Sequence, residues 1–485
     1  DADVNVAIGM QSLSSDTKGS KSVAVGAYTL ISQNFTSATD SFNTAVGHSA
    51  GGSVTTGVEN TLIGGLAGDA ITDADYNVAV GKGALGTNQL GSRNTAVGTN
   101  SLHTANPASA ADTYNTAFGY DAGYAITTGT VNTLIGGLSG DALTVGNSNV
   151  AVGYGSLTTD TKGDRNVAIG VSALETQNFT TSTDSYNVAV GYTAGQSITT
   201  GVQNTLIGGR AADALTTGVN NTAVGEEALS ADTKGNRSTA IGIAALANQN
   251  FTSDTDSHNT AVGSRAGVEV TTGIQNTLIG SNAGDAITDA DGNVVVGYAA
   301  MTTNVLGSSS VAIGRSALYY QNPASATDMY NVAVGQNAGG AVTTGTLNTF
   351  VGGLAGDATN DGSENTAVGY LALSANCGNG NTAMGSGAGR LVTGAQNTIM
   401  GESSGYAITS GGNNLILGKN AGRGGSPGGE ISTGSNEIVL GDQNITEAHV
   451  QVDWTVASDK RDKTDVTPME MGLDFVNKLE PVTYK

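Results

Sequence analysis

The chain has 485 residues, with 72 glycines, 5% aromatic residues and a formal net charge of −22. Its 19 basic residues against 41 acidic ones argue against nucleic-acid binding and against electrostatic docking to an anionic membrane. The single cysteine, Cys377, excludes a disulfide framework within the chain and a four-cysteine zinc site. No apolar run reaches ~18 residues, so the sequence predicts no membrane insertion.

A five-residue string, Asn-Thr-Ala-Val-Gly or a close variant, recurs from Asn5 to Gly441. Its closing glycines are mostly 17 or 21 residues apart, and three steps of 17 with one of 21 make a superperiod of 72 residues. A fixed period of this kind indicates a solenoid, in which each rung contacts mainly its neighbours. We therefore interpret residues 1–441 as one repetitive β-helical shaft, although the chain length alone suggests about three globular domains.

Within each rung, the three residues between Asn and Gly are small, β-branched or aliphatic, which predicts a short strand. The glycine predicts a turn that needs positive φ or the close approach of another backbone. Asn fills its position in 21 of 25 rungs. This predicts a ladder of side-chain hydrogen bonds between rungs, with a row of ligand contacts as the alternative. Segments such as Ala84-Leu85 and Ala122–Ile126 predict a second short strand. At ~4.8 Å per rung, the shaft would be on the order of 120 Å long.

Every fourth rung of the superperiod carries four additional residues. These inserts lie at a fixed register and are therefore expected to protrude on one face. Their aromatic residues could stack on a sugar, or could fold back to cap the wider rung. The insert segments are 33–42, 104–114, 177–186, 249–258 and 321–330, and they contain Phe35, Phe179 and Phe251 and end on Phe42, Tyr114, Tyr186, His258 and Tyr330.

The strings Ser22–Gly26 and Asn166–Leu174 resemble the head repeats of trimeric autotransporter adhesins. The resemblance covers about residues 5–441 and implies a parallel β-roll in which three chains pack together. The spacing of 17 and 21 departs from the shorter adhesin repeats. Independently, a thin roll has a high ratio of surface to volume, so three copies sharing an apolar seam would enlarge its core. We expect an all-β shaft and a parallel homotrimer.

The repeat stops near residue 442. Residues 442–457 are interpreted as a closing segment with the only tryptophan, Trp454. Pro468 is well placed to begin a helix with an apolar face, and Pro481 would end it.

Ser458, Asp459, Arg461 and the run Leu479–Tyr484 look like the opening of the intramolecular chaperone domain found at the ends of phage tailspikes and tail fibres. The resemblance covers residues 458–485, an incomplete start of such a domain. It implies a domain that trimerises, helps the β-rod to fold and then cuts itself off. It places the serine nucleophile on Ser458 and the partner lysine on Lys463, with cleavage after Ala457. A lysine can deprotonate serine only if burial lowers its pKa. The alternative is an exposed linker without chemistry.

Three acidic segments resemble fragments of calcium-binding loops, namely residues 72–75, 288–292 and 357–364. None completes a binding loop with its terminal glutamate. Because Asp and Gly are also ordinary turn residues, the sequence predicts no metal and no cofactor.

Taken together, these features favour a trimeric phage tail fibre, a structural virion protein for host attachment. Its partners would be two further copies, other tail or baseplate proteins, and a host-surface glycan or protein receptor. Apart from one self-cleavage event, we expect no enzymatic activity. The alternatives are a tailspike polysaccharide depolymerase, a bacterial trimeric surface adhesin, and the fibre of a phage-like injection particle. Active sites usually interrupt a repeat with an irregular insertion. The repeat in this chain is regular, which argues against the depolymerase.

Overall fold

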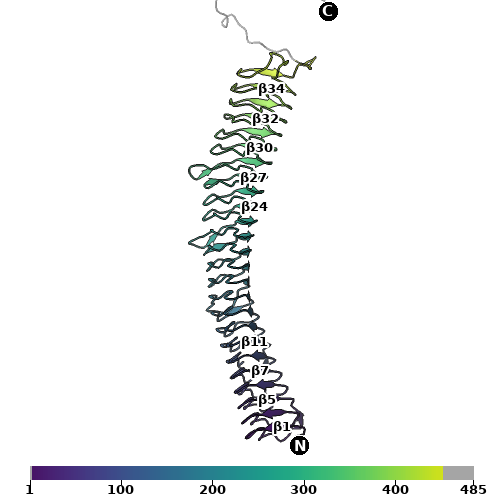
Figure 1. Ribbon diagram of the computed structural model, residues 1–485, viewed down its shortest axis with the longest axis vertical. Helices are drawn as coiled ribbons and strands as arrows, with labels where there is room; N and C mark the ends of the chain where they lie inside the picture. Colours follow the sequence, from purple (N-terminus) through teal and green to yellow (C-terminus); the bar gives the residue numbers. More distant parts are fainter. Residues whose placement is uncertain (1–2, 452–485) are drawn as a thin grey trace, which may run out of the picture. The chain divides into compact units, whose positions relative to one another are not determined.

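The computed structural model describes residues 3–451, and the contacts divide the chain into the units Asp1–Asp442 and Gln443–Lys485. The first unit is a parallel β-solenoid, which Figure 1 shows as a gently curved rod of stacked rungs. The predicted all-β parallel shaft is confirmed. Among the described residues, no helix is long and apolar enough to cross a membrane.

The main sheet contains 25 strands, each of three residues, and every pair of neighbours is parallel. Its strands are β1 (Val6–Ile8), β3 (Val23–Val25), β5 (Thr44–Val46), β6 (Thr61–Ile63), β7 (Val78–Val80), β9 (Thr95–Val97), β11 (Thr116–Phe118), β12 (Thr133–Ile135), β13 (Val150–Val152), β15 (Val167–Ile169), β17 (Val188–Val190), β18 (Thr205–Ile207), β19 (Thr222–Val224), β21 (Thr239–Ile241), β23 (Thr260–Val262), β24 (Thr277–Ile279), β25 (Val294–Val296), β27 (Val311–Ile313), β29 (Val332–Val334), β30 (Thr349–Val351), β31 (Thr366–Val368), β32 (Thr382–Met384), β33 (Thr398–Met400), β34 (Leu415–Leu417) and β35 (Ile438–Leu440).

Five small two-stranded parallel sheets occur at the insert rungs. Their strands are β2 (Gly19–Ser20) with β4 (Thr39–Asp40), β8 (Gly91–Ser92) with β10 (Ala111–Asp112), β14 (Gly163–Asp164) with β16 (Thr183–Asp184), β20 (Gly235–Asn236) with β22 (Thr255–Asp256), and β26 (Gly307–Ser308) with β28 (Thr327–Asp328).

Strand register places each residue beside its counterpart in the next rung. Ala45 of β5, for example, pairs with Ala24 of β3 and with Leu62 of β6. Because successive side chains of a strand point to opposite faces, the middle residue of every main-sheet strand from β3 to β35 lies inside the rod, whereas Ala7 of the first strand, β1, is exposed. These middle residues are small or aliphatic in nearly every rung, and together with buried turn residues they form one continuous core from Leu13 to Val439. Each chain therefore has a core of its own.

The predicted asparagine ladder is confirmed. The backbone N–H of Asn60 donates to Oδ1 of Asn43 at 2.9 Å, and Nδ2 of Asn60 donates to the carbonyl of Ala74 at 2.9 Å. Both asparagines are fully buried. A buried amide side chain is tolerated because these hydrogen bonds satisfy its polar atoms. The same bonds provide partners for backbone N–H and carbonyl groups in the turns of its own and neighbouring rungs.

The closing glycine of each rung also has the predicted role. Gly208 has φ = +138°, and a Cβ added to it would lie 2.4 Å from the carbonyl oxygen of Gly225. Any side chain here would collide with the backbone of the next rung. This explains why glycine recurs at this position throughout the repeat.

The prediction of a second strand in each rung is wrong. The segment Ala84-Leu85 lies in turns, and Leu85 has the left-handed φ of 51°. A left-handed residue interrupts an extended strand. Both side chains are fully buried, and the N–H of Leu85 donates to the carbonyl of Ser101 at 3.0 Å. The segment therefore supplies core and inter-rung hydrogen bonds without being a strand.

Candidate interaction surfaces

The outer side of the main sheet is free of charged side chains in the strands themselves. The third residue of all 25 strands, from Ile8 of β1 to Leu440 of β35, is Val, Ile, Leu, Met or Phe. The first residue of every strand is Thr, Val, Leu or Ile. We call the column formed by the third residues the apolar face.

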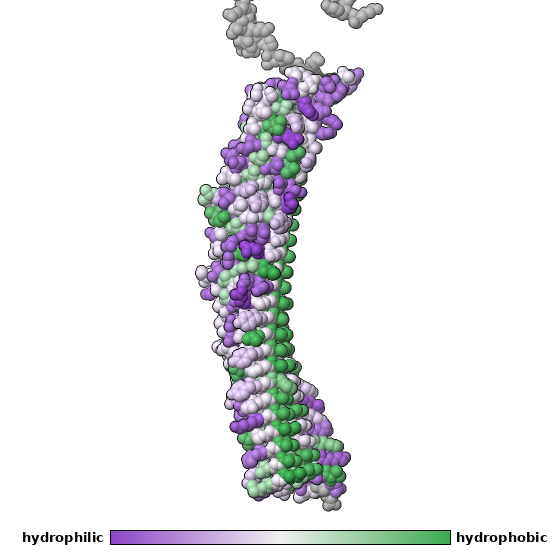
Figure 2. All heavy atoms as spheres, in the orientation of Figure 1, coloured by the Kyte–Doolittle hydropathy of each residue, from purple (hydrophilic) through white to green (hydrophobic). Residues whose placement is uncertain are grey.

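Many side chains of the apolar face remain exposed in the single chain. Ile63 is 38% exposed, Ile135 is 41% exposed and Phe118 is 50% exposed. Figure 2 shows the face as a green band along one side of the rod. Monomeric proteins rarely expose contiguous apolar patches larger than a few hundred Å², so a column that runs through all the rungs is a candidate interaction surface.

The inserts combine both orientations that the sequence left open. Phe35, Phe179 and Phe251 fold back and are only 5–6% exposed, so these rings cap the wider rung. The aromatic residues that end the inserts point outward instead. Of these, Phe42 is 51% exposed and Tyr114 is 53% exposed.

Charged pairs link the inserts to the preceding rung. Lys21 Nζ lies 2.6 Å from Asp40 Oδ2 and 4.9 Å from the centre of the Phe42 ring. The same arrangement recurs 72 residues later, where Arg93 lies 2.9 Å from Asp112 and 5.9 Å from the Tyr114 ring. These groups are about half exposed, and such pairs each contribute little to stability.

Buried carboxyl groups, which the sequence analysis did not identify, anchor two of the inserts. Gln177 Nε2 donates to Asp160 Oδ2 at 2.6 Å, and Asn187 Nδ2 donates to Gln177 Oε1 at 2.8 Å. The network thereby joins the insert to the asparagine ladder. Burial raises the pKa of Asp160 and, in the equivalent network, of Asp232, although hydrogen bonds from glutamine and backbone N–H groups oppose the rise. The recurrence of Asp or Asn at 72-residue steps was the available signal, at Asp16, Asn88, Asp160, Asp232 and Asn304.

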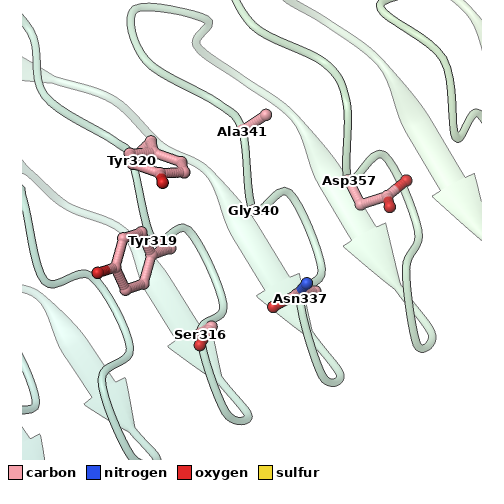
Figure 3. Close-up of a pocket in the computed structure, with 7 residues that line it drawn as sticks. All are labelled: Ser316, Tyr319, Tyr320, Asn337, Gly340, Ala341 and Asp357. Carbon is pink, nitrogen blue, oxygen red and sulfur yellow. The ribbon is translucent and has the colours of Figure 1, made fainter.

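A groove of about 290 Å³ lies in the turns that follow strands β27, β29 and β30. Figure 3 shows Tyr319 and Tyr320 on one side of it, with Asn337 and Asp357 contributed by the next two rungs. The two tyrosine rings are 4.7 Å apart between their centres and are nearly perpendicular, at 75°. Gly340 also lines the groove and has no side chain to fill it.

The acidic segments that resemble calcium-loop fragments and the residues expected for self-cleavage differ in how far the structure describes them. Within residues 3–451, no three His, Cys, Asp or Glu side chains are grouped so that they could hold a metal ion. In one of the acidic segments, the Asp75 carboxylate instead accepts the backbone N–H of Val58 at 2.7 Å. Ser458, Lys463, Trp454 and the helix expected after Pro468 lie outside the described residues.

The C-terminal segment has a recognisable relationship to known proteins. Residues 458–485 match the family described as the chaperone of endosialidase. No curated protein matches the chain. The family match coincides with the segment that resembles an intramolecular chaperone. A β-solenoid shaft followed in sequence by a match to the chaperone of endosialidase fits a protein of the tail-fibre or tailspike kind.

Proposed function

We propose that this protein is the trimeric shaft of a phage tail fibre, located in the virion and used for attachment to the host surface. The observation that carries the proposal is the combination of an uninterrupted solenoid with the chaperone match at residues 458–485. Its partners would be further copies of itself, other tail or baseplate proteins, and a glycan or protein receptor on the host. The net charge of −22 would help to keep a long β-rod soluble.

The apolar face is the proposed contact between the three chains. A three-fold arrangement of parallel rods would bring three such columns to a common axis and remove Val, Ile and Phe side chains from water. Burial of apolar surface stabilises by ~25 cal/mol per Å². Because the face runs through all 25 strands, even modest burial per rung would sum to a large favourable term.

A chaperone is needed because the shaft can pair out of register. Strands β6, β12, β18 and β24 all read Thr-Leu-Ile and lie 72 residues apart. A shift by one superperiod would therefore preserve many of the side-chain contacts between chains. A trimeric clamp at the C-terminal end would align the three chains before the long-range pairing begins.

Self-cleavage is proposed to follow assembly. In this step the Ser458 hydroxyl would attack the carbonyl carbon of Ala457 while Lys463 accepts the hydroxyl proton. The C–N bond between Ala457 and Ser458 would then break, and the leaving Ser458 nitrogen would take up that proton to become an amine. Water would hydrolyse the resulting ester to the Ala457 carboxylate and the Ser458 hydroxyl. Mass spectrometry of the protein and of Ser458→Ala tests this. A shortened product for the unaltered chain and an uncut Ser458→Ala chain are expected, whereas equal lengths would contradict cleavage.

Sedimentation of the unaltered protein tests the assembly. The expected particle contains three chains and is elongated, with three times the chain mass of 48.1 kDa before cleavage and a smaller mass after it. A compact single chain would contradict the proposal.

Incubation with host capsule or lipopolysaccharide separates the alternatives, since release of reducing ends would favour the depolymerase and binding without turnover would favour the fibre. If the protein bound cells related to the bacterium that produces it, and not cells that a phage infects, the adhesin would be favoured.

A further inference from the structure

The groove beside Tyr319 and Tyr320 departs from the repeat around it. At successive steps of 72 residues towards the N-terminus, this pair is replaced by Ala247-Asn248, Glu175-Thr176, His103-Thr104 and Ile31-Ser32. The rod therefore forms without a pair of tyrosines at these positions. In a repetitive molecule, a feature that the fold does not require is a candidate for a role in binding.

A second feature keeps the groove open. Gly340 stands where the repeat has Val268, Gln196 and Tyr124 at 72-residue steps, and glycine occurs there once more, at Gly52. Because Gly340 lines the groove, side chains of that size at this position would reduce its volume. The two changes together make a cavity of about 290 Å³. Ligand pockets have volumes upward from roughly 300 Å³, so this groove lies at the lower limit. A groove of this size would suit one sugar ring.

Polar groups surround the aromatic pair. Asp357 Oδ1 accepts a hydrogen bond from Ser374 Oγ at 2.6 Å, which orients the carboxylate. Among the described residues, no hydrogen bond engages the Asn337 amide, the Ser316 hydroxyl or the hydroxyls of the two tyrosines. The groove therefore offers donors and acceptors from three adjacent rungs next to an aromatic surface (Figure 3).

This combination is suited to a carbohydrate. The apolar C–H face of a pyranose packs on an aromatic ring, while its hydroxyls pair with carboxylate, amide and hydroxyl groups. No lysine or arginine is among the residues that line the groove, and Asp357 contributes a negative charge. A neutral sugar is thus favoured over an acidic one, because an anionic ligand would lie beside the carboxylate without a compensating cation.

We propose that this groove binds one residue of a neutral surface polysaccharide, with Tyr320 as the stacking platform and Asp357 and Asn337 as hydrogen-bonding partners. The proposal rests on the proposed host-attachment function for its biological setting, but the groove itself is built within a single chain. Affinity for one sugar residue would be weak. Repetition of the site in the three copies of a fibre would raise the effective affinity for a polymer.

Saturation-transfer NMR with methyl glycosides of glucose, galactose, mannose and N-acetylglucosamine tests the proposal, with N-acetylneuraminic acid as the acidic probe. Signal transfer to at least one neutral glycoside is expected. Tyr320→Ala should weaken that binding about tenfold or more, and Tyr320→Phe should retain most of it. Tyr320 is 55% exposed, so both variants are expected to fold. The matched control is Tyr192→Ala, at a tyrosine that is 64% exposed elsewhere on the rod.

The groove assignment is overturned if no neutral glycoside shows transfer, if the acidic sugar is preferred, or if Tyr320→Ala and Tyr192→Ala behave alike. Sedimentation of the same samples keeps this result separate from the proposed function. A trimer without sugar binding would overturn the groove and leave the fibre proposal intact. A single chain that binds sugar would support the groove and contradict the trimeric fibre.

Discussion

At the scale of single residues, buried polar side chains hold the rungs together. Asn204 illustrates the ladder: its Nδ2 donates to the carbonyl of Gly218 at 2.9 Å, and its Oδ1 accepts the backbone N–H of Asn221 at 3.0 Å. Its two neighbours in the ladder are Asn187 and Asn221. Because each asparagine serves two rungs, the ladder couples local stability along the rod.

Asn204→Ala is therefore expected to destabilise the shaft. The substitution leaves a buried carbonyl and a buried N–H without partners, and each unsatisfied group costs ~1–3 kcal/mol. The midpoint of thermal unfolding followed by circular dichroism measures the effect. Thr200→Ala, at an exposed turn position, is the control. Equal midpoints for the two variants would mean that the ladder does not stabilise the rod.

The buried carboxyls of Asp160 and Asp232 predict a dependence of stability on pH. Burial raises the pKa of both groups in the folded chain. They therefore bind protons more tightly when folded, and their favourable contribution is complete below the unfolded pKa of about 3.9 and is lost as the pH rises through the folded pKa. Each unit of pKa difference corresponds to about 1.4 kcal/mol.

Lowering the pH from about 7 to about 4 should accordingly stabilise the unaltered protein relative to the double variant Asp160→Asn and Asp232→Asn. Asparagine is compatible with the site, since Asn88 and Asn304 occupy the equivalent positions and bond the same turn. Unfolding midpoints across this pH range measure the difference. The exposed Asp361→Asn is the control. Parallel pH curves for the unaltered protein and the double variant would contradict the prediction.

At the scale of one rung, backbone geometry matters more than strand propensity. Each strand has only three residues, and the turns contain many residues with left-handed φ, including leucine and asparagine. Such residues carry a conformational cost of order 1–3 kcal/mol. The stacking of identical turns offsets this cost, because each turn donates to and accepts from the rungs beside it.

Two adjacent glycines provide a matched test of this geometry. Gly208→Ala should destabilise the protein by more than about 2 kcal/mol, because the new Cβ would meet the carbonyl oxygen of Gly225 at 2.4 Å and the residue has φ = +138°. At Gly209, an added Cβ would have no atom within 4 Å, and its φ is outside the left-handed region. Gly209→Ala should be neutral or stabilising by up to ~1 kcal/mol. The midpoint of thermal unfolding measures the stability of both variants. A similar loss of stability in both would contradict the explanation by close approach of the next rung's backbone.

At the scale of the whole molecule, the apolar face is the feature that a single chain leaves unexplained. Its position outside the chain's own core means that folding of one chain does not bury it. Association would do so, and association through this face should fail when charge is placed on it. Ile207 and Ile279, each 39% exposed, are suitable sites one superperiod apart.

The double variant Ile207→Lys and Ile279→Lys should sediment as single chains or as unstable assemblies, because assembly would force three lysines together at each level without counter-charges. The control carries the same two charges on exposed turns, as Thr128→Lys and Thr200→Lys, and should remain trimeric. A stable trimer of the face variant would exclude the apolar face as the contact.

Most of the fold was predictable because the repeat imposes it. A strand of Thr-Leu-Ile or Val-Ala-Val ended by Gly returns at steps of mostly 17 or 21 residues, and only in-register parallel stacking places Asn43 against Asn60 and Gly47 against Gly64. The second apolar segment was misassigned, since left-handed φ at Leu85 is favoured by stacking on its neighbours and not by its own propensity. The burial of Phe35 beside the exposure of Phe42 likewise depends on how the insert folds back.

The amino-acid sequence by itself determined the all-β class, the parallel stacking, the asparagine ladder and the position of the chaperone-like segment, because each is a property of period and residue type. Only the tertiary structure decided which strand residues form the apolar face, which carboxyls are buried, and that Tyr319, Tyr320, Asn337 and Asp357 line one groove. These features join residues from different rungs, and their side-chain directions follow from the turn geometry of a complete coil.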